Sequence, residues 1–172
     1  FNREYGLGVE ESWVCPTYGV VTALYFTILA LTEPGDRVMI HTPIYDPFYA
    51  IIRNTGREIV DCGLVHEDGT YRIDYERMEE QMKAGVRMLI FCNPHNPTGR
   101  VWTDEELSGV TAFCKRHNLL LLSDDIHGDF VWPGHVYKPL LTMYHNPEQE
   151  KVIVFNSLTK TLNIPGLIFS SV

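Results

Sequence analysis

The chain has 172 residues, of which 45% are hydrophobic and 21% are charged, and its formal net charge is −8. This length supports one sizeable core, so we expect a single domain that spans residues 1–172. The acidic balance and the lack of a basic stripe argue against a nucleic-acid surface, and no apolar run approaches the ~20 residues of a membrane span.

Helical and extended segments alternate along the first half of the chain. Apolar residues continue for a helical length after Gly19 and stop at a turn over residues 33–36. The residues Tyr75, Met78 and Met82 recur at helical spacing. The elements predicted here are helices over residues 19–31, 45–53 and 74–83, strands over 37–41, 57–61 and 86–92, and a turn at 67–69.

The second half contains the clearest helical pattern, over residues 103–117. Thr103 and Glu106 have the spacing of a capping box at its start. Asn118 can adopt the left-handed conformation that ends a helix. The remaining predicted elements are apolar strands over residues 119–122 and 151–156 and a buried strand in the apolar run 167–172.

Apolar strands that alternate with helices are typical of a mainly parallel sheet covered on both faces. We therefore predict an α/β fold with three layers, α/β/α. In such sheets, ligands bind beyond the carboxyl ends of the strands. The polar residues of interest should therefore be those that directly follow the predicted strands.

The chain ends and the cysteines bear on the parent protein. The sequence starts without a methionine, in a polar segment that begins at Phe1, and it stops within the apolar run that ends at Val172. We therefore expect a piece of a longer protein. The four cysteines form no C-x-x-C pair, which favours reduced thiols in a cytoplasmic protein.

Three polar side chains follow predicted strands: Asn96 in N-P-H-N-P-T-G, Asp124 in S-D-D-I-H and Lys160 in S-L-T-K. Together they supply what pyridoxal phosphate requires, namely an amine for the aldehyde, a carboxylate for the ring nitrogen and an amide for the ring hydroxyl. Alone, the lysine would be read as a surface residue, the aspartate as a cap and the asparagine as part of a rigid turn. The combination and its order favour the cofactor.

The segment that begins with Asp124 allows a second interpretation. Asp124, Asp125, His127 and Asp129 could be metal ligands, but no matching pair of histidines is found elsewhere in the sequence, so we predict no metal. Alternation along the strand directs Asp124 and Asp125 to opposite sides. His127 could donate to the ring hydroxyl oxygen or pack beneath it.

A phosphate site is predicted where the first helix begins. Gly19, Val20 and Val21 open this helix, and free amides at a helix N-terminus bind anions, although the glycine alone could be an ordinary helix entry. Ser157 could add a hydroxyl to the same phosphate. Tyr45 could lay its ring on an aromatic ligand or pack in the core.

These segments resemble a known family. Together with residues 17–21 (T-Y-G-V-V), 42–48 (T-P-I-Y-D-P-F) and 157–167 (S-L-T-K-T-L-N-I-P-G-L), they are similar to the fold-type I pyridoxal phosphate enzymes of the class I/II aminotransferases. The sequence is most similar to the cystathionine β-lyase branch of the MalY/PatB type, which are C–S lyases. The resemblance covers essentially the whole chain.

The resemblance implies a role for each candidate residue. Lys160 would bind the cofactor aldehyde and move the proton at the substrate α-carbon. The other implied contacts are Asp124 with the pyridine nitrogen, Asn96 and His127 with the ring hydroxyl, Tyr45 with the ring face, and Gly19, Val20, Val21 and Ser157 with the phosphate. The resemblance also implies a homodimer, in which an N-terminal segment and a small C-terminal domain carrying the substrate-carboxylate arginine lie outside this chain.

Two residues depart from the family pattern. Ile168 stands eight residues after the lysine, where the family has a basic or polar residue, and this weakens the expected grip on the phosphate. Asp125 replaces a glutamate.

The resemblance implies β-elimination from an L-cystathionine-like amino acid, which gives a thiol, pyruvate and ammonia. An aminotransferase acting on L-amino acids would use the same residues, so it remains an alternative. A third possibility is the effector domain of a transcription regulator that borrows this fold. Without its other segments, the chain itself is expected to be inactive.

Overall fold

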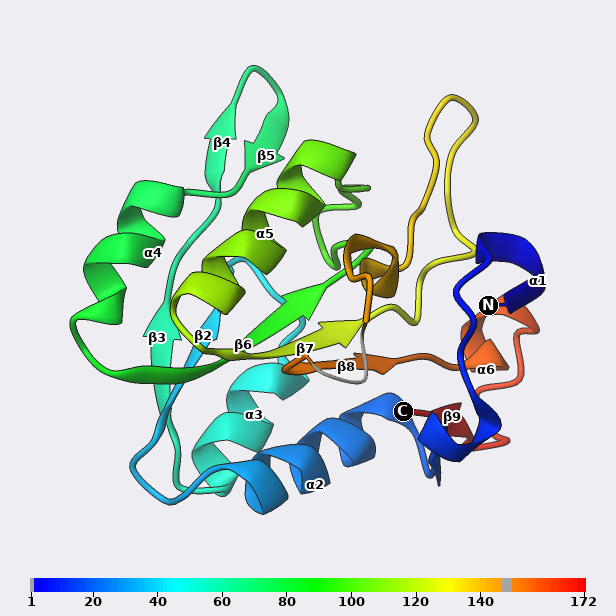
Figure 1. The fold of residues 1–172 in the computed structure, drawn as a ribbon, viewed down its shortest axis with the longest axis horizontal. Helices are drawn as coiled ribbons and strands as arrows, with labels where there is room; N and C mark the ends of the chain where they lie inside the picture. Colours follow the sequence, from blue (N-terminus) through cyan, green and yellow to red (C-terminus); the bar gives the residue numbers. More distant parts are fainter. Residues whose placement is uncertain (1, 147–149) are drawn as a thin grey trace.

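A five-stranded parallel sheet lies between two layers of helices (Figure 1). The computed structural model describes residues 2–146 and 150–172, so Phe1, where the expected polar segment begins, lies outside the described residues. The strand order in the central sheet is β3-β2-β6-β7-β8. The fold class predicted from the alternating pattern is therefore observed.

The elements are as follows. The strands are β1 (Pro16–Thr17), β2 (Arg37–Ile40), β3 (Glu58–Asp61), β4 (Val65–Glu67), β5 (Thr70–Arg72), β6 (Val86–Cys92), β7 (Leu120–Asp124), β8 (Val152–Phe155) and β9 (Ser170–Ser171). The helices are α1 (Asn2–Tyr5), α2 (Val20–Leu31), α3 (Pro47–Asn54), α4 (Tyr75–Met82), α5 (Asp104–Arg116) and α6 (Leu158–Thr161). Short 3₁₀ turns occur at Glu11–Trp13 and Leu140–Met143.

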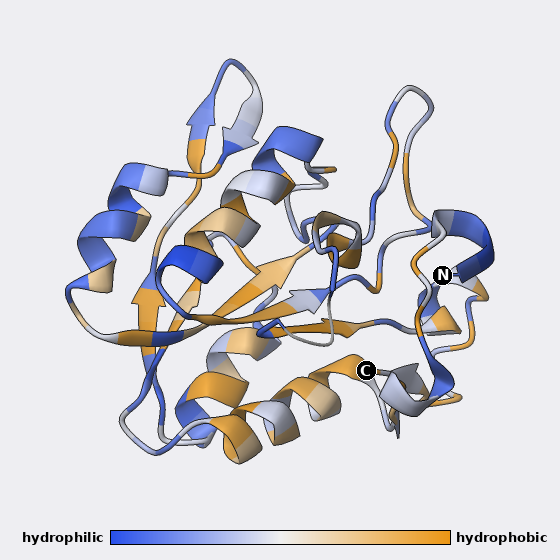
Figure 2. Ribbon diagram, in the orientation of Figure 1, coloured by the Kyte–Doolittle hydropathy of each residue, from blue (hydrophilic) through white to orange (hydrophobic). Residues whose placement is uncertain are grey.

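Each face of the sheet has its own core, because successive residues of a buried strand point to opposite faces. In β6, Leu89 and Phe91 pack beneath α4 and α5, whereas Met88 and Ile90 pack against α2 and α3. Figure 2 shows hydrophobic residues along these strands and along α2, while α4 is mostly hydrophilic. Among the described residues, no helix combines the length and apolar character needed to cross a bilayer.

Helix α5 begins and ends as the sequence predicts. Thr103 accepts a hydrogen bond from the Glu106 amide, and the Glu106 carboxylate accepts one from the Thr103 amide, which completes the capping box. Asn118 has a positive φ of 57° just past the helix. These local signals come from adjacent residues, so they are readable without the fold.

Two predicted boundaries are wrong. Helix α3 starts at Pro47 rather than Tyr45, because proline suits the first helical position. The run 167–172 is not a buried strand: only Ser170–Ser171 is extended, and it pairs with β1 outside the central sheet. Leu167 and Ile168 therefore remain 66% and 64% exposed, since neither core reaches them.

The register of the sheet brings three strand ends to one level. Asp124 of β7 lies beside Cys92 of β6 and Phe155 of β8. The segments that follow these strands must therefore leave the sheet at the same edge. They carry Asn96, His127 and Lys160.

Candidate active site

A pocket of about 320 Å³ opens at this edge of the sheet. Eight of the nine predicted site residues line it, namely Gly19, Val20, Val21, Tyr45, Asn96, Asp124, His127 and Lys160. A larger hollow of about 880 Å³ lies along the outer side of β8 and contains none of them. The smaller pocket is the candidate site because the predicted chemistry converges there.

Asp124 is a buried carboxylate at the end of β7. It is 5% exposed, and one of its oxygens accepts a hydrogen bond of 3.2 Å from the Ile126 amide. Burial raises the pKa of Asp124 to about 7, and the neighbouring Asp125 carboxylate adds to this rise. Such a carboxylate would be stabilised by a cationic hydrogen-bond donor in the pocket.

His127 presents an unused polar atom. Its Nδ1 is buried and has no hydrogen-bond partner among the described residues. Burial, together with the nearby Lys160 charge, lowers the pKa of the His127 imidazole. A neutral ring with a buried, unpaired nitrogen is suited to a polar ligand group, since an unmade buried hydrogen bond is costly.

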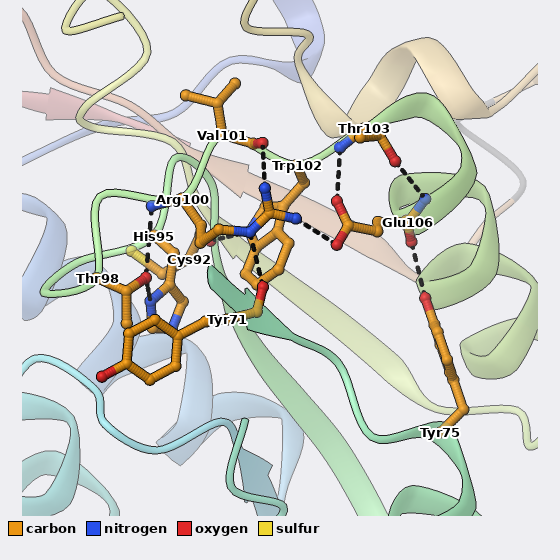
Figure 3. A network of polar contacts seen from close by, with 10 residues as sticks. All are labelled: Tyr71, Tyr75, Cys92, His95, Thr98, Arg100, Val101, Trp102, Thr103 and Glu106. Atoms are coloured by element: carbon orange, nitrogen blue, oxygen red, sulfur yellow. Dashed lines mark hydrogen bonds and ion pairs between the residues drawn. The ribbon is translucent and has the colours of Figure 1, made fainter. Parts of the chain in front are cut away.

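The loop that carries Asn96 is fixed from beneath. The backbone N–H of Asn96 donates to Cys92 Sγ at 3.4 Å, and Trp102 Nε1 donates to the Cys92 carbonyl at 2.8 Å. Figure 3 shows how Arg100 extends this network to Glu106 in α5 and to the Tyr71 carbonyl. Asn96 is therefore placed by several contacts rather than by the Asn-Pro turn alone.

The N-terminus of α2 forms another wall. Gly19 is its N-cap with φ 85°, and no side chain caps the helix. The amides of Val20 and Val21 have no preceding carbonyl within the helix, so they can bind an anion. A Cβ at Gly19 would lie 3.3 Å from Ile168 Cγ2, which means that an apolar side chain already closes this corner.

Lys160 and Ser157 differ in their placement. Lys160 lies in the short helix α6, lines the pocket and is exposed. The structure does not bring Ser157 into the pocket lining. Its hydroxyl instead caps α6 by accepting from the Thr159 amide at 3.1 Å, and it donates to the Phe169 carbonyl.

Tyr45 lines the pocket from the loop before α3. It is 41% exposed, and its ring meets Phe48 edge-on at 5.9 Å. Tyr45 therefore does not pack in the core, which was the alternative interpretation. The aromatic side chain that is fully buried here is that of Phe48.

Several lining residues were not predicted from the sequence. They are Tyr18, Thr22, Ile126, Thr159, Pro165 and Phe169. Thr159 and Ile126 adjoin predicted residues, so proximity in sequence was the available signal. Phe169 gave no signal, because its place depends on the pairing of β9 with β1.

Within residues 2–146 and 150–172, no group of three or more His, Cys, Asp or Glu side chains is arranged to hold a metal ion. Asp125 does not line the pocket, and it accepts a hydrogen bond from Tyr137 OH instead. The carboxylates of this segment are therefore divided between the pocket and the protein interior.

Pyridoxal phosphate fits this set of donors and acceptors. The buried Asp124 carboxylate offers an acceptor for a protonated ring nitrogen, and the unpaired His127 Nδ1 offers a partner for a ring oxygen. The amides at the start of α2 suit a phosphate, and Lys160 supplies the amine. No lining residue is incompatible with the cofactor, although Ile168 makes the pocket apolar beside Gly19, where the phosphate is expected.

Comparisons with known proteins agree with this assignment. Residues 1–169 match the family Aminotransferase class I and II. Over 172 residues the chain is 38% identical to cystathionine beta-lyase PatB of Bacillus subtilis, and the match covers 99% of this chain and 44% of PatB.

Two solved structures share the fold. Cystalysin from Treponema denticola, whose crystal structure contains a pyridoxal 5'-phosphate cofactor, has 35% identity and a TM-score of 0.94, with 99% of this chain and 43% of cystalysin covered. The PLP-bound C-S lyase from Staphylococcus hominis has 31% identity and a TM-score of 0.93, with 99% and 43% covered. The chain thus spans less than half the length of these proteins, and the predicted large-domain fold is confirmed.

Proposed function

This chain belongs to the class I and II aminotransferase family, and on that premise we propose that its parent protein is a pyridoxal phosphate enzyme that acts on L-amino acids. The reaction we favour is β-elimination from a thioether such as L-cystathionine. Addition of water then gives a thiol, pyruvate and ammonia. The convergence of Lys160, Asp124 and His127 on one pocket carries the proposal.

Bound pyridoxal phosphate supplies an aldehyde that reacts with amines and a ring that withdraws electrons from the substrate α-carbon. Lys160 Nζ would hold the cofactor aldehyde and would take the proton from the substrate α-carbon. Asp124 would keep the ring nitrogen protonated, since a buried carboxylate is stabilised by a cationic partner. A protonated ring is the stronger electron acceptor.

The remaining residues orient the cofactor. The side-chain amide of Asn96 and the His127 imidazole would bind the ring hydroxyl oxygen, and Tyr45 would cover one face of the ring. The backbone amides of Val20 and Val21 would bind the phosphate with the positive end of the α2 dipole. Each of these residues lines the pocket.

The choice of β-elimination is supported by the relatives named cystathionine beta-lyase and C-S lyase. Transamination is the second candidate, supported by the name of the matching family. Both reactions begin with removal of the same α-proton, so the residues of this pocket serve either.

Product analysis of the full-length enzyme separates the two reactions. We expect incubation with L-cystathionine to release thiol and pyruvate, and incubation with an L-amino acid and 2-oxoglutarate to transfer no amino group. Glutamate formation without thiol release would establish the aminotransferase instead. Failure of both, together with no uptake of the cofactor, would refute the proposed function.

A further inference from the structure

Asp125 is a buried carboxylate that the proposed reaction does not use. It is fully buried directly after Asp124, just past the end of β7, yet it does not line the pocket. Tyr137 OH donates to it at 2.6 Å, and the Leu140 amide donates at 3.5 Å. Ser123 Oγ donates to its other oxygen.

These hydrogen-bond donors stabilise the charged form of the buried Asp125 carboxylate. Burial raises the pKa of Asp125 to about 6, and the hydrogen bonds from Ser123, Tyr137, Leu140 and Asn93 oppose a larger rise. These hydrogen bonds favour the ionised form of the carboxylate. A buried ionised acceptor makes strong hydrogen bonds, so its donors are held firmly.

The tyrosine that donates to Asp125 also covers the backbone beside His127. A Cβ placed on Gly128 would lie 2.7 Å from Tyr137 Cε1 and 2.9 Å from Cζ. The Tyr137 ring thus lies directly on Gly128, the residue after His127. Gly128 is itself tied back by its amide, which donates to the Asp125 carbonyl at 3.1 Å.

The same segment reaches the loop that carries Asn96. Asn93 Nδ2 donates to the Lys138 carbonyl at 3.0 Å, and the Asn93 amide donates to the Asp124 carbonyl at 2.9 Å. Lys138 directly follows Tyr137. Two walls of the pocket therefore share one support behind them.

We propose that Asp125 and Tyr137 form a clamp that positions His127 in the pocket, with Tyr137 pressing on the Gly128 backbone. Neither residue lines the pocket, so both act as positioning residues rather than catalytic ones. The effect of the clamp on cofactor binding rests on the proposed function. Its effect on His127 does not, because it concerns the protein without cofactor.

The first test is NMR of the full-length protein labelled with ¹⁵N-histidine, without cofactor. Tyr137→Phe removes only the donor to Asp125 and leaves every charge in place. We expect the His127 ring signals, identified by their loss in His127→Gln, to shift in this variant while those of His66 in the β4–β5 hairpin stay fixed. Unchanged His127 signals would overturn the clamp.

Two further variants complete this test, one as a second perturbation of Tyr137 and one as a matched control. Gly128→Ala pushes the Tyr137 ring aside and keeps the Asp125 carboxylate, so it should shift the same His127 signals if Tyr137→Phe folds poorly. Tyr144→Phe alters another buried tyrosine, which packs beneath Lys115 and lies outside this pocket. This control should leave the His127 signals unchanged, and a shift as large as that of Tyr137→Phe would contradict the clamp.

The second test is a titration of each variant with pyridoxal phosphate. We expect Tyr137→Phe to weaken binding by about tenfold, the size of effect typical of residues that orient a ligating side chain from behind, and Tyr144→Phe to bind as the unaltered protein does. Shifted His127 signals with unchanged affinity would overturn the cofactor part of the inference. A parent protein that takes up no cofactor would refute the proposed function, while the NMR result would still decide the clamp.

Discussion

The two side chains proposed to grip opposite ends of the cofactor lie in regions of contrasting construction. Asp124 belongs to the aspartate wall, residues 120–128, whose strand is buried in both cores. Lys160 belongs to the lysine wall, residues 157–169, where most apolar side chains are exposed. The lysine wall is held by hydrogen-bonded turns instead, such as the Ser157 cap of α6.

This contrast shows that one pocket can combine two kinds of support. Burial of apolar surface fixes the aspartate wall and resists change, because closely packed interiors tolerate little displacement. Turns with exposed backbone hydrogen bonds open at lower free energy. Substitutions on the two walls should therefore separate effects on chemistry from effects on stability.

The largest effect is expected from Lys160→Ala. This change removes the only amine among the lining residues of the pocket, so the full-length variant should lose the absorbance of the lysine-bound cofactor and all measurable turnover. Its stability should barely change, because Lys160 is exposed. Absorbance spectra and borohydride trapping measure the loss.

Lys83→Ala is the matched control, since Lys83 is an exposed lysine at the end of α4. The control should retain both the band and the trapped adduct. An adduct found on another lysine in the unaltered protein would reject the assignment of Lys160.

The next effect concerns the stability of the aspartate wall. Leu122 is fully buried in β7, two residues before Asp124. Leu122→Ala should lower the free energy of unfolding by about 2–5 kcal/mol, because it leaves a cavity in a core that cannot close completely. Urea unfolding of the cofactor-free protein measures this, and a loss below 1 kcal/mol would contradict the rigid aspartate wall.

A pH effect follows from Asp124. Its pKa is about 7 when folded, against 3.8 for the ordinary group, so the folded state binds the proton more tightly. Its contribution to stability is complete below pH ~3.8 and is lost as the pH rises through about 7. Between pH 5 and 8, the unaltered cofactor-free protein should therefore lose stability relative to Asp124→Asn.

We expect this difference to amount to about 2–4 kcal/mol, from the free energy that corresponds to a pKa change of this size. Urea unfolding of both proteins across the pH series measures it. Comparison with the variant is essential because the three histidines whose pKa is lowered, His41, His95 and His127, have the opposite pH dependence. Parallel stability curves for the two proteins would show that Asp124 is not protonated in the folded state.

The smallest effect is expected from the same substitution on the lysine wall. Leu162 is 58% exposed just after α6. Leu162→Ala should change the free energy of unfolding by no more than about 0.5 kcal/mol, although the side chain removed is the one removed in Leu122→Ala. A loss comparable to that of Leu122→Ala would mean that this wall has a core of its own.

The sequence predicted best where local and long-range signals agree. Strand β6 and helix α5 have long apolar patterns, and Thr103 and Glu106 cap the helix within four residues. The β4–β5 hairpin appeared only as a turn, because its two short strands show no clear periodicity. The run 167–172 was wrongly predicted as a buried strand, since Leu167, Ile168 and Phe169 face solvent or line the pocket.

The candidate site follows the same rule. Asn96 and Asp124 come directly after long buried strands, so the topology of a parallel sheet already placed them together. Ser157 lies near Lys160 and has a hydroxyl that could bind phosphate, but this hydroxyl caps α6 instead. Tyr137 could not be predicted, because its contact with Asp125 closes a loop of 12 residues that has no regular structure.

The level register of Cys92, Asp124 and Phe155 has a consequence for insertions and deletions. Side chains on a strand alternate strictly, so a slip of one position exchanges the two faces. In β7 this slip would bring Asp125 to the side of the pocket and turn Asp124 inward. A carboxylate would still face the pocket, but the acceptor of the Tyr137 hydroxyl would be displaced. A shift of register in this strand would therefore preserve the charge at the pocket and lose the alignment of Asp125 with Tyr137.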